Sequence, residues 1–370
     1  INSFGYVTNY ELLLKNSNSA YLNNYLGVCL AQQKKFKESL KYFNKSLSIE
    51  KNADDAIFNK SLLNLRLGNF KEGWKLYSAG LSKNNNIREV FENYFSEQTP
   101  LWDGKPFEGT LLVYGEQGIG DQLMFGTVFD DLIKIQKNVA AVVDERLKKL
   151  FERTYPNIKV FGIKEDLTFL NHSKYISMGG LCNYLRKDIQ DFKNGLFKPY
   201  ITSQEKDKQV KSLFPLRENL RIGVSWLSFA KKNAERRSLS SEQLSSIINS
   251  NQHTFINLQY GIINNHLDEI KNLSAKPLHH IPGIDLTHNI DSLASIINNC
   301  DLIITIDNST AHLASSLGKP VWILLPYFND FRWMENSEDT IWYKNALLLR
   351  QNKKNDWSQV INYINSALDQ

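Results

Sequence analysis

From residue 110 onward the chain repeats one pattern: a short apolar run, a turn, and a longer helical stretch. Strands that are apolar on both faces need cover on both faces, so this alternation predicts parallel sheets lying between helices. The charged stretch 201–219, which contains Pro215, divides the strands into two series. The expected strands are Leu111–Tyr114, Val139–Val143, Lys159–Phe161 and Tyr175–Ser177, then Arg221–Trp226, Thr254–Gln259, Leu302–Ile306 and Val321–Leu325.

The N-terminal part of the chain has a different period. Residues 36–48 and 70–82 align at a spacing of 34 residues, with six identities in thirteen positions, and helical stretches at 21–33 and 55–67 precede them. A helix–turn–helix period of 34 residues is typical of tetratricopeptide repeats, which stack to leave a concave groove. We expect about two and a half repeats, with residues 3–15 as the last helix of an incomplete one.

Composition excludes several classes of protein. The 370 residues leave room for two or three domains, and the net charge of +5 is too small and too dispersed to favour nucleic-acid binding. Cys29, Cys182 and Cys300 lie far apart in apolar surroundings, as reduced thiols do, and no apolar run approaches the roughly 20 residues of a membrane span. We therefore expect a cytoplasmic protein without a transmembrane segment. The chain does not begin with Met, which indicates that it could be cut from a longer one.

The first candidate site is the turn Gly115–Asp121, which follows the strand expected at 111–114. A glycine-rich turn between a strand and a helix exposes backbone N–H groups that can bind a ligand. Asp121 comes just before the helix expected at 122–135. It is either a capping residue of that helix or a general base that takes a proton from an attacking hydroxyl.

The second candidate site is Asp307–His312, which also lies where an expected strand ends and a helix begins. Asn308, Ser309 and Thr310 are all good N-cap residues, and free N–H groups at this helix end would receive a phosphate. His312 could add a hydrogen bond or a charge. Plain helix capping and a buried core histidine explain the same residues.

A basic cluster follows the strand expected at 221–226. Its members are Lys231, Lys232, Arg236 and Arg237. Cations at the end of a strand suit a phosphate or diphosphate, although a solvated loop explains them too. The chain contains no Asp-x-Asp motif for a metal-bound diphosphate, no Gly-x-Ser-x-Gly elbow and no Walker lysine loop.

Together these motifs resemble a known family. Asp307–Ala314, continuing to Gly318–Trp322, resembles the donor-site signature of heptosyltransferase-like glycosyltransferases (glycosyltransferase family 9), and Gly118–Asp121 is similar to their acceptor-side loop. A subgroup with N-terminal tetratricopeptide repeats matches further motifs. These are Pro100-x-Trp102-Asp103-Gly104, Gly115–Asp121, Leu258–Gly261, and the tail from Arg332-Trp333 through Trp342-Tyr343 to Leu349–Gln351.

The resemblance implies the GT-B architecture, two Rossmann-like domains facing each other across a cleft. It implies a role for each matched residue. These are Asp121 as catalytic base; Glu116, Gln117, Gly118 and Gly120 as the acceptor-side loop; and Lys232, Arg237, Gln259, Asp307, Ser309, Thr310 and His312 as donor-binding residues. A nucleotide sugar is the co-substrate, with no metal or other cofactor.

The chain departs from the family at two places. Where relatives often place an acidic residue near the nucleotide ribose, this chain has Ile262–His266, so neither the ribose contact nor the nucleotide is predicted. The tetratricopeptide segment is absent from lipopolysaccharide heptosyltransferases, so a heptose donor and a lipid acceptor are not predicted either.

The sequence therefore predicts an α plus α/β chain. Its parts are tetratricopeptide helices at 1–83, a connector at 84–109, an acceptor-side Rossmann-like domain at 110–200, a donor domain at 220–355 and a C-terminal helix at 356–370. The expected activity is metal-independent transfer of a sugar to an acceptor hydroxyl, on a protein Ser or Thr or a glycan presented by the repeats. The alternative is a catalytically inactive scaffold that binds a nucleotide sugar or a protein partner.

Overall fold

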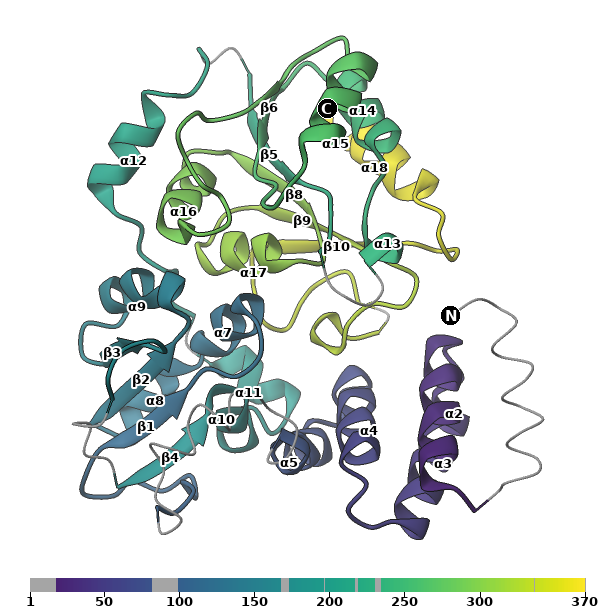
Figure 1. Ribbon diagram of the computed structural model, residues 1–370, viewed down its shortest axis with the longest axis vertical. Coiled ribbons are helices and arrows are strands. Elements are labelled where there is room, and N and C mark those ends of the chain that lie inside the picture. Colours follow the sequence, from purple (N-terminus) through teal and green to yellow (C-terminus); the bar gives the residue numbers. More distant parts are fainter. Residues whose placement is uncertain are drawn as a thin grey trace. The chain divides into compact units, whose positions relative to one another are not determined.

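The structure, a computed structural model, describes residues 18–81, 99–167, 173–195, 197–216, 219–229, 234–335 and 337–369 (Figure 1). The chain divides into two compact units. The helical unit contains the described residues up to Thr99, with Gly179–Asn194 and Asp330–Glu335. The α/β unit contains Pro100–Met178, Gly195–Asn329 and the described residues after Asn336. The helix expected at 3–15 lies outside the described residues.

Four helices make up most of the helical unit: α2 (Ala20–Gln32), α3 (Phe36–Ile49), α4 (Asp54–Arg66) and α5 (Phe70–Leu81). Helices α2 and α3 run antiparallel, because Ser39 Oγ donates to Gly27 O (2.6 Å) and Ser46 Oγ donates to Ala20 O (2.7 Å). A Cβ on Gly27 would lie 2.5 Å from Phe43 Cε1, so only glycine allows this approach. These helix pairs agree with the 34-residue period, and their assignment as tetratricopeptide repeats stays a prediction.

Two later segments of the sequence pack within the helical unit. Helix α11 (Ile189–Asn194) places the Phe192 ring 5.0 Å from that of Phe70, between centroids. The 3₁₀ turn η2 (Phe331–Trp333) places Phe331 against Trp74, at 6.2 Å. These segments lie far along the sequence from the repeats, so the repeat pattern did not predict their place.

Beside η2, the buried carboxylate of Glu335 lies between two cations. Lys34 Nζ is 2.6 Å from Glu335 Oε1, and Arg66 Nη1 is 3.2 Å from Oε2. The Arg66 and Glu335 side chains are only 5% and 8% exposed, so this is a buried ion pair, in which removing one charge is costly.

The first sheet of the α/β unit is parallel, with strand order β3-β2-β1-β4. Its strands are β1 (Leu111–Tyr114), β2 (Val139–Val143), β3 (Lys159–Gly162) and β4 (Lys174–Ser177). The helices of this half are α7 (Ile119–Gly126), α8 (Phe129–Ile135) and α9 (Lys148–Thr154), with the 3₁₀ turn η1 (Glu145–Leu147) before α9. Helix α10 (Met178–Leu185) follows β4 and belongs, from Gly179 on, to the helical unit. All four strands lie within one residue of the predicted ranges.

The prediction of one helix over 122–135 is wrong, because α7 ends at Gly126 and α8 starts at Phe129. Thr127 Oγ1 donates to Met124 O (2.6 Å), and Tyr155 Oη donates to Gly126 O (2.8 Å). These side-chain hydroxyls use carbonyls that a continuous helix would give to backbone N–H groups. The break therefore depends partly on Tyr155, which no local pattern could reveal.

The second sheet is also parallel and has the order β10-β9-β8-β5-β6-β7. Its strands are β5 (Arg221–Ser225), β6 (Thr254–Asn257), β7 (Leu278–His279), β8 (Leu302–Ile306), β9 (Val321–Leu325) and β10 (Ala346–Arg350). Counted within this half, the order is 6-5-4-1-2-3, the Rossmann arrangement. Strands β7 and β10 were not expected from the sequence. Strand β7 has two residues, too few for a periodic signal.

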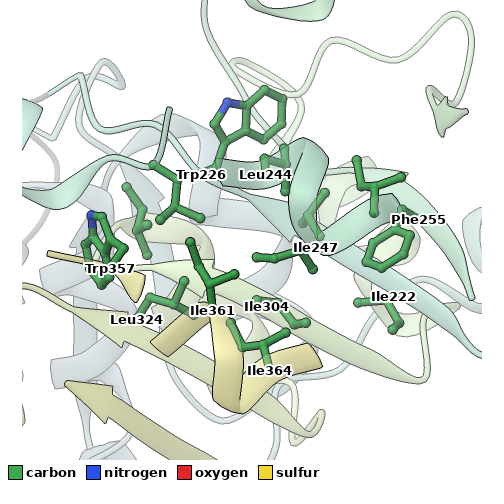
Figure 2. Packing of buried hydrophobic residues seen from close by; sticks show 14 of the residues in the cluster. Ile222, Trp226, Leu244, Ile247, Phe255, Ile304, Leu324, Trp357, Ile361 and Ile364 are labelled. Carbon is green, nitrogen blue, oxygen red and sulfur yellow. The ribbon is translucent and has the colours of Figure 1, made fainter. Parts of the chain in front are cut away.

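Helices cover both faces of this sheet: α12 (Gln204–Lys211), α13 (Ala234–Arg237), α14 (Ser241–Ser250), α15 (Asn264–Leu273), α16 (Ile290–Asn298), α17 (Ser309–Ser316) and α18 (Ser358–Leu368). Figure 2 shows Ile361 and Ile364 of α18 beside Ile304 of β8 within one buried cluster. The C-terminal helix, yellow in Figure 1, therefore packs on the second half of the α/β unit, next to α14.

Across the described ranges, no helix combines the length and the apolar character that crossing a bilayer requires.

Replacing Glu335 tests the buried ion pairs of the helical unit. Glu335→Gln should lower the free energy of unfolding by about 3 kcal/mol, because it removes the carboxylate charge from a buried ion pair with Arg66 and from the contact with Lys34. Urea unfolding followed by circular dichroism measures the change. Glu338→Gln, at an exposed position three residues further along the chain, is the control and should shift the free energy by less than about 0.5 kcal/mol. If both variants unfold at the same urea concentration, the ion pairs of Glu335 do not stabilise the helical unit.

Candidate functional site

Each sheet of the α/β unit has one point where the strand order reverses, between β1 and β4 and between β5 and β8. In open parallel sheets, ligands bind in the crevice outside the carboxyl ends of the strands at such a point. The turn Gly115–Asp121 follows β1, and Asp307 follows β8. The sequence-predicted candidates therefore lie at the two positions where the topology favours a ligand.

The buried side chain of Gln259 holds the loop after β5. Its Oε1 accepts hydrogen bonds from the N–H groups of Trp226 (2.8 Å) and Leu227 (2.7 Å). Its Nε2 donates to Leu227 O (3.2 Å) and Tyr260 O (3.1 Å), which uses both of its N–H groups. Gln259 therefore shapes the loop, and its amide is engaged with protein groups rather than offered to a ligand.

Arg237 and Asp307 are brought together at the same edge. Arg237 is the last residue of α13, and its Nη1 lies 3.6 Å from Asp307 Oδ2 and 3.5 Å from Asp307 O. Ser228 N, in the loop after β5, donates to Ser238 Oγ (3.0 Å), which fixes the residue that follows Arg237. The Arg237 side chain is half-buried, so the guanidinium is both oriented and accessible. Lys231 and Lys232 lie outside the described residues.

Asn308 is the N-cap of α17. Its Oδ1 accepts from Thr310 N (2.9 Å) and Ala311 N (3.3 Å), and its Nδ2 donates to Ser225 Oγ (2.9 Å). Of the three residues that the sequence offered as caps, tertiary contacts select this one. Two of the N–H groups expected to receive a phosphate are therefore already engaged, which corrects that expectation.

The other predicted residues of α17 are buried or half-buried at its first turn. Ser309 is half-buried, and Thr310 Oγ1 is buried without a hydrogen-bond partner among the described residues. The His312 ring is buried, with Nδ1 3.0 Å from Tyr343 Oη. In the sequence, Tyr343 stands out only as part of the tail motif. Its contact with His312 spans 31 residues and leaves no local signal.

The turn after β1 starts its helix earlier than predicted. Gly118 is the N-cap and Ile119 the first helical residue, so Asp121 is the third residue of α7. Asp121 Oδ2 accepts from Gly118 N (3.3 Å), so the carboxylate takes part in capping while it stays half-buried. Glu116 is fully buried, and Gln117 has a φ of 64°, a left-handed conformation that is uncommon outside glycine.

The two turns, about 190 residues apart in the sequence, meet in space. A Cβ on Gly120 would lie 2.9 Å from His312 Cδ2 and 3.5 Å from Ser309 Cα. The N-terminal turn of α7 therefore packs directly on that of α17. Glycine at position 120 is what allows this approach.

Among the residues that the structure describes, no group of three or more His, Cys, Asp or Glu side chains is arranged to hold a metal ion.

No protein-family model matches this chain. It is 28% identical over 291 residues to Protein FlbA of Caulobacter vibrioides, an alignment that covers 72% of this chain and 47% of that protein. The chain thus spans about half the length of this curated relative.

Two of the solved structures that resemble the chain are glycosyltransferases. One is the ADP-heptose lipopolysaccharide heptosyltransferase II of E. coli, with a TM-score of 0.50 and 12% identity over 70% of this chain and 98% of that one. The other is a glycosyl transferase family 9 protein of Veillonella parvula DSM 2008, with a TM-score of 0.47 and 13% identity over 66% and 86%. The first likeness shows the fold: Rossmann-like α/β halves similar to those of GT-B heptosyltransferases.

Adding a methyl group at position 120 tests the contact between the two turns. Gly120→Ala should lower the free energy of unfolding by about 1–3 kcal/mol, because the new Cβ overpacks a buried histidine ring held by Tyr343. Thermal unfolding measures the change.

Gly118→Ser is the control for Gly120→Ala. Its Cβ would meet Asp121 Oδ2 at an ordinary 3.7 Å, and serine is a good N-cap residue. We expect it to change stability by less than about 0.5 kcal/mol. If Gly120→Ala behaves like this control, the two turns are not in close contact.

Proposed function

We propose that the chain is a glycosyltransferase that moves a sugar from a nucleotide-sugar donor to an acceptor hydroxyl. The observation that carries the proposal is the meeting of the two turns, where Gly120 of α7 lies against His312 of α17. This contact brings the carboxylate-bearing first turn of one Rossmann-like half beside the helix end of the other. The heptosyltransferase-like fold supports the same reading.

The diphosphate of the donor would bind at the reversal point between β5 and β8. Arg237 offers a planar guanidinium fork there, oriented by its contact with Asp307. The hydroxyl of Thr310, which has no hydrogen-bond partner among the described residues, can bind a phosphate oxygen, and Ser309 stands at the positive end of the α17 dipole. Lys232 belongs to this set by sequence, with Lys231 and Arg236 as its neighbours.

In the proposed reaction, the oxygen of the acceptor hydroxyl bonds to the anomeric carbon of the sugar. Asp121 takes the hydroxyl proton, and the bond from that carbon to the diphosphate oxygen breaks. The electron pair leaves with the diphosphate. Arg237 and the N-terminal end of α17 neutralise the charge that develops there, so the proposed reaction needs no metal ion.

The acceptor is proposed to be a protein Ser or Thr, or a glycan, presented by the helical unit. The antiparallel pairing of α2 with α3 and the 34-residue period support this, because stacked helix pairs of that period leave a concave binding surface.

The donor is found by measuring thermal stabilisation of the chain with a panel of nucleotide sugars. A ligand at about 100 times its dissociation constant adds roughly 2.7 kcal/mol to the free energy of unfolding.

Asp121→Asn should lower the rate of transfer from that donor by at least about 100-fold, because the amide cannot accept the proton. Its donor affinity should stay within about twofold, because the amide oxygen can still accept from Gly118 N. Release of the nucleoside diphosphate measures transfer.

Asp268→Asn, at an exposed position of α15, is the control and should transfer at the wild-type rate. Full activity of Asp121→Asn would refute the base assignment. Donor binding by the wild type without transfer or hydrolysis on any acceptor would favour the inactive-scaffold alternative.

A second experiment tests the diphosphate site. Arg237→Ala should weaken donor binding by about 10- to 100-fold, because a charge-assisted hydrogen bond contributes about 1.5–3 kcal/mol. Arg236→Ala removes the preceding cation of the same short helix, half-buried in the structure, and should bind almost normally. Isothermal titration calorimetry measures both. Equal losses in the two variants would mean that general charge, and not the position of Arg237, attracts the donor.

A further inference from the structure

Three apolar side chains stand at the carboxyl ends of β5 and β6 without a role in the site described so far. Phe229 is 50% exposed, Ile262 is 90% exposed, and Tyr260 is half-buried. The Phe229 and Tyr260 ring centroids lie 5.9 Å apart at an interplanar angle of 51°. Single exposed apolar residues are common in proteins, but a cluster of large ones beside a ligand crevice marks an interaction site.

The backbone holds the Phe229 ring in place. Gly261 has a φ of +89°, and a Cβ on it would lie 2.6 Å from Phe229 Cε2, so the ring lies directly against the Gly261 backbone. Gly261 N in turn donates to Thr287 Oγ1 (3.1 Å). On its other side, Phe229 follows Ser228, whose N–H is bound to Ser238 Oγ. The ring is therefore exposed but preorganised.

The same edge lacks the group that usually holds a ribose. In Rossmann domains an acidic residue about 20 residues after the glycine-rich turn binds the ribose hydroxyl, whereas residues 258–263 of this chain contain no Asp or Glu. The Gln259 amide is engaged by the loop after β5. Asp285, near Thr287, accepts from the N–H groups of Thr287 and His288 and pairs with His288 Nδ1 at 2.8 Å.

We propose that Phe229, Tyr260 and Ile262 form a nucleobase platform, which binds the donor nucleoside through the plane of its base rather than through a carboxylate on its ribose. This inference rests on the proposed function. The platform lies at the ends of β5 and β6, and the Arg237 site lies at the ends of β5 and β8, so the two sites are adjacent along the edge of the sheet. Neighbouring strands are about 4.8 Å apart. A nucleoside 5′-diphosphate can therefore place its base on the platform and its phosphates at Arg237.

The experiment compares nucleoside diphosphates with inorganic pyrophosphate on the full chain by isothermal titration calorimetry. ADP, GDP, UDP and CDP are titrated first, and the tightest is used with each variant. Phe229→Ala should weaken its binding by about 5- to 150-fold, the range measured for one base–aromatic stack, and leave pyrophosphate binding unchanged. Arg237→Ala should weaken both. The 2′-deoxy form of the same nucleotide should bind within about threefold of the ribose form.

Phe229→Trp is the control for misfolding, and Leu216→Ala is the control for general effects of removing an exposed apolar side chain. Phe229→Trp keeps a stacking ring and should keep the affinity, with its indole fluorescence quenched by the nucleotide. Ile262→Ala should weaken nucleotide binding about threefold or more, while Leu216→Ala, at a residue that is also 90% exposed, should not.

The outcomes separate the platform from the proposed function. If Arg237→Ala weakens nucleotide binding while Phe229→Ala and Ile262→Ala bind as the wild type does, the platform is wrong and the diphosphate site stands. A loss of more than tenfold with the 2′-deoxy nucleotide also overturns the platform, since it assigns recognition to the ribose. If the wild type binds neither nucleotides nor pyrophosphate, the proposed function fails and the platform with it.

Discussion

A small hydrogen-bond network at the reversal point of the second sheet positions most of the candidate site. Gln259, after β6, holds the loop that follows β5, and Ser225 Oγ, at the end of β5, donates to its Oε1 (3.1 Å). The same Ser225 Oγ accepts from Asn308, which caps α17. Because these groups are buried, losing one partner would leave another unsatisfied, at a cost of about 1–3 kcal/mol. Arg237, Asp307 and the first turn of α17 keep their places through this network.

The approach of α7 to α17 depends on this frame and on the absence of a side chain at Gly120. His312 fills the space that a Cβ would take, and Tyr343 holds the histidine ring at Nδ1. Since interiors pack at the density of organic crystals, even one added methyl group has to displace a neighbour. The proposed chemistry needs this closeness, because a base on one half must reach an acceptor beside a donor held by the other.

Prediction from sequence succeeded where the signal is local. The strand Leu302–Ile306 is apolar at nearly every position, as a strand buried on both faces must be, and its limits are confirmed. Prediction failed where residues distant in the sequence decide where an element ends or what it packs against. Tyr155 contributes to the break between α7 and α8, and β7 is a two-residue strand held by its pairing with β6. Segment 330–335 packs with helices encoded some 260 residues earlier, which no periodicity within it could indicate.

The sequence by itself determined the classes of element and the two turns that carry the candidate site, because apolar period, glycine and capping residues act over a few neighbouring positions. It also placed Asp121 and His312 at helix starts. Only the tertiary structure decided that these starts lie together, that Asn308 rather than Ser309 or Thr310 caps α17, and that the Gln259 amide serves the loop. These contacts join segments that are far apart in the chain. They form only when the chain folds, so no pattern within one segment can predict them.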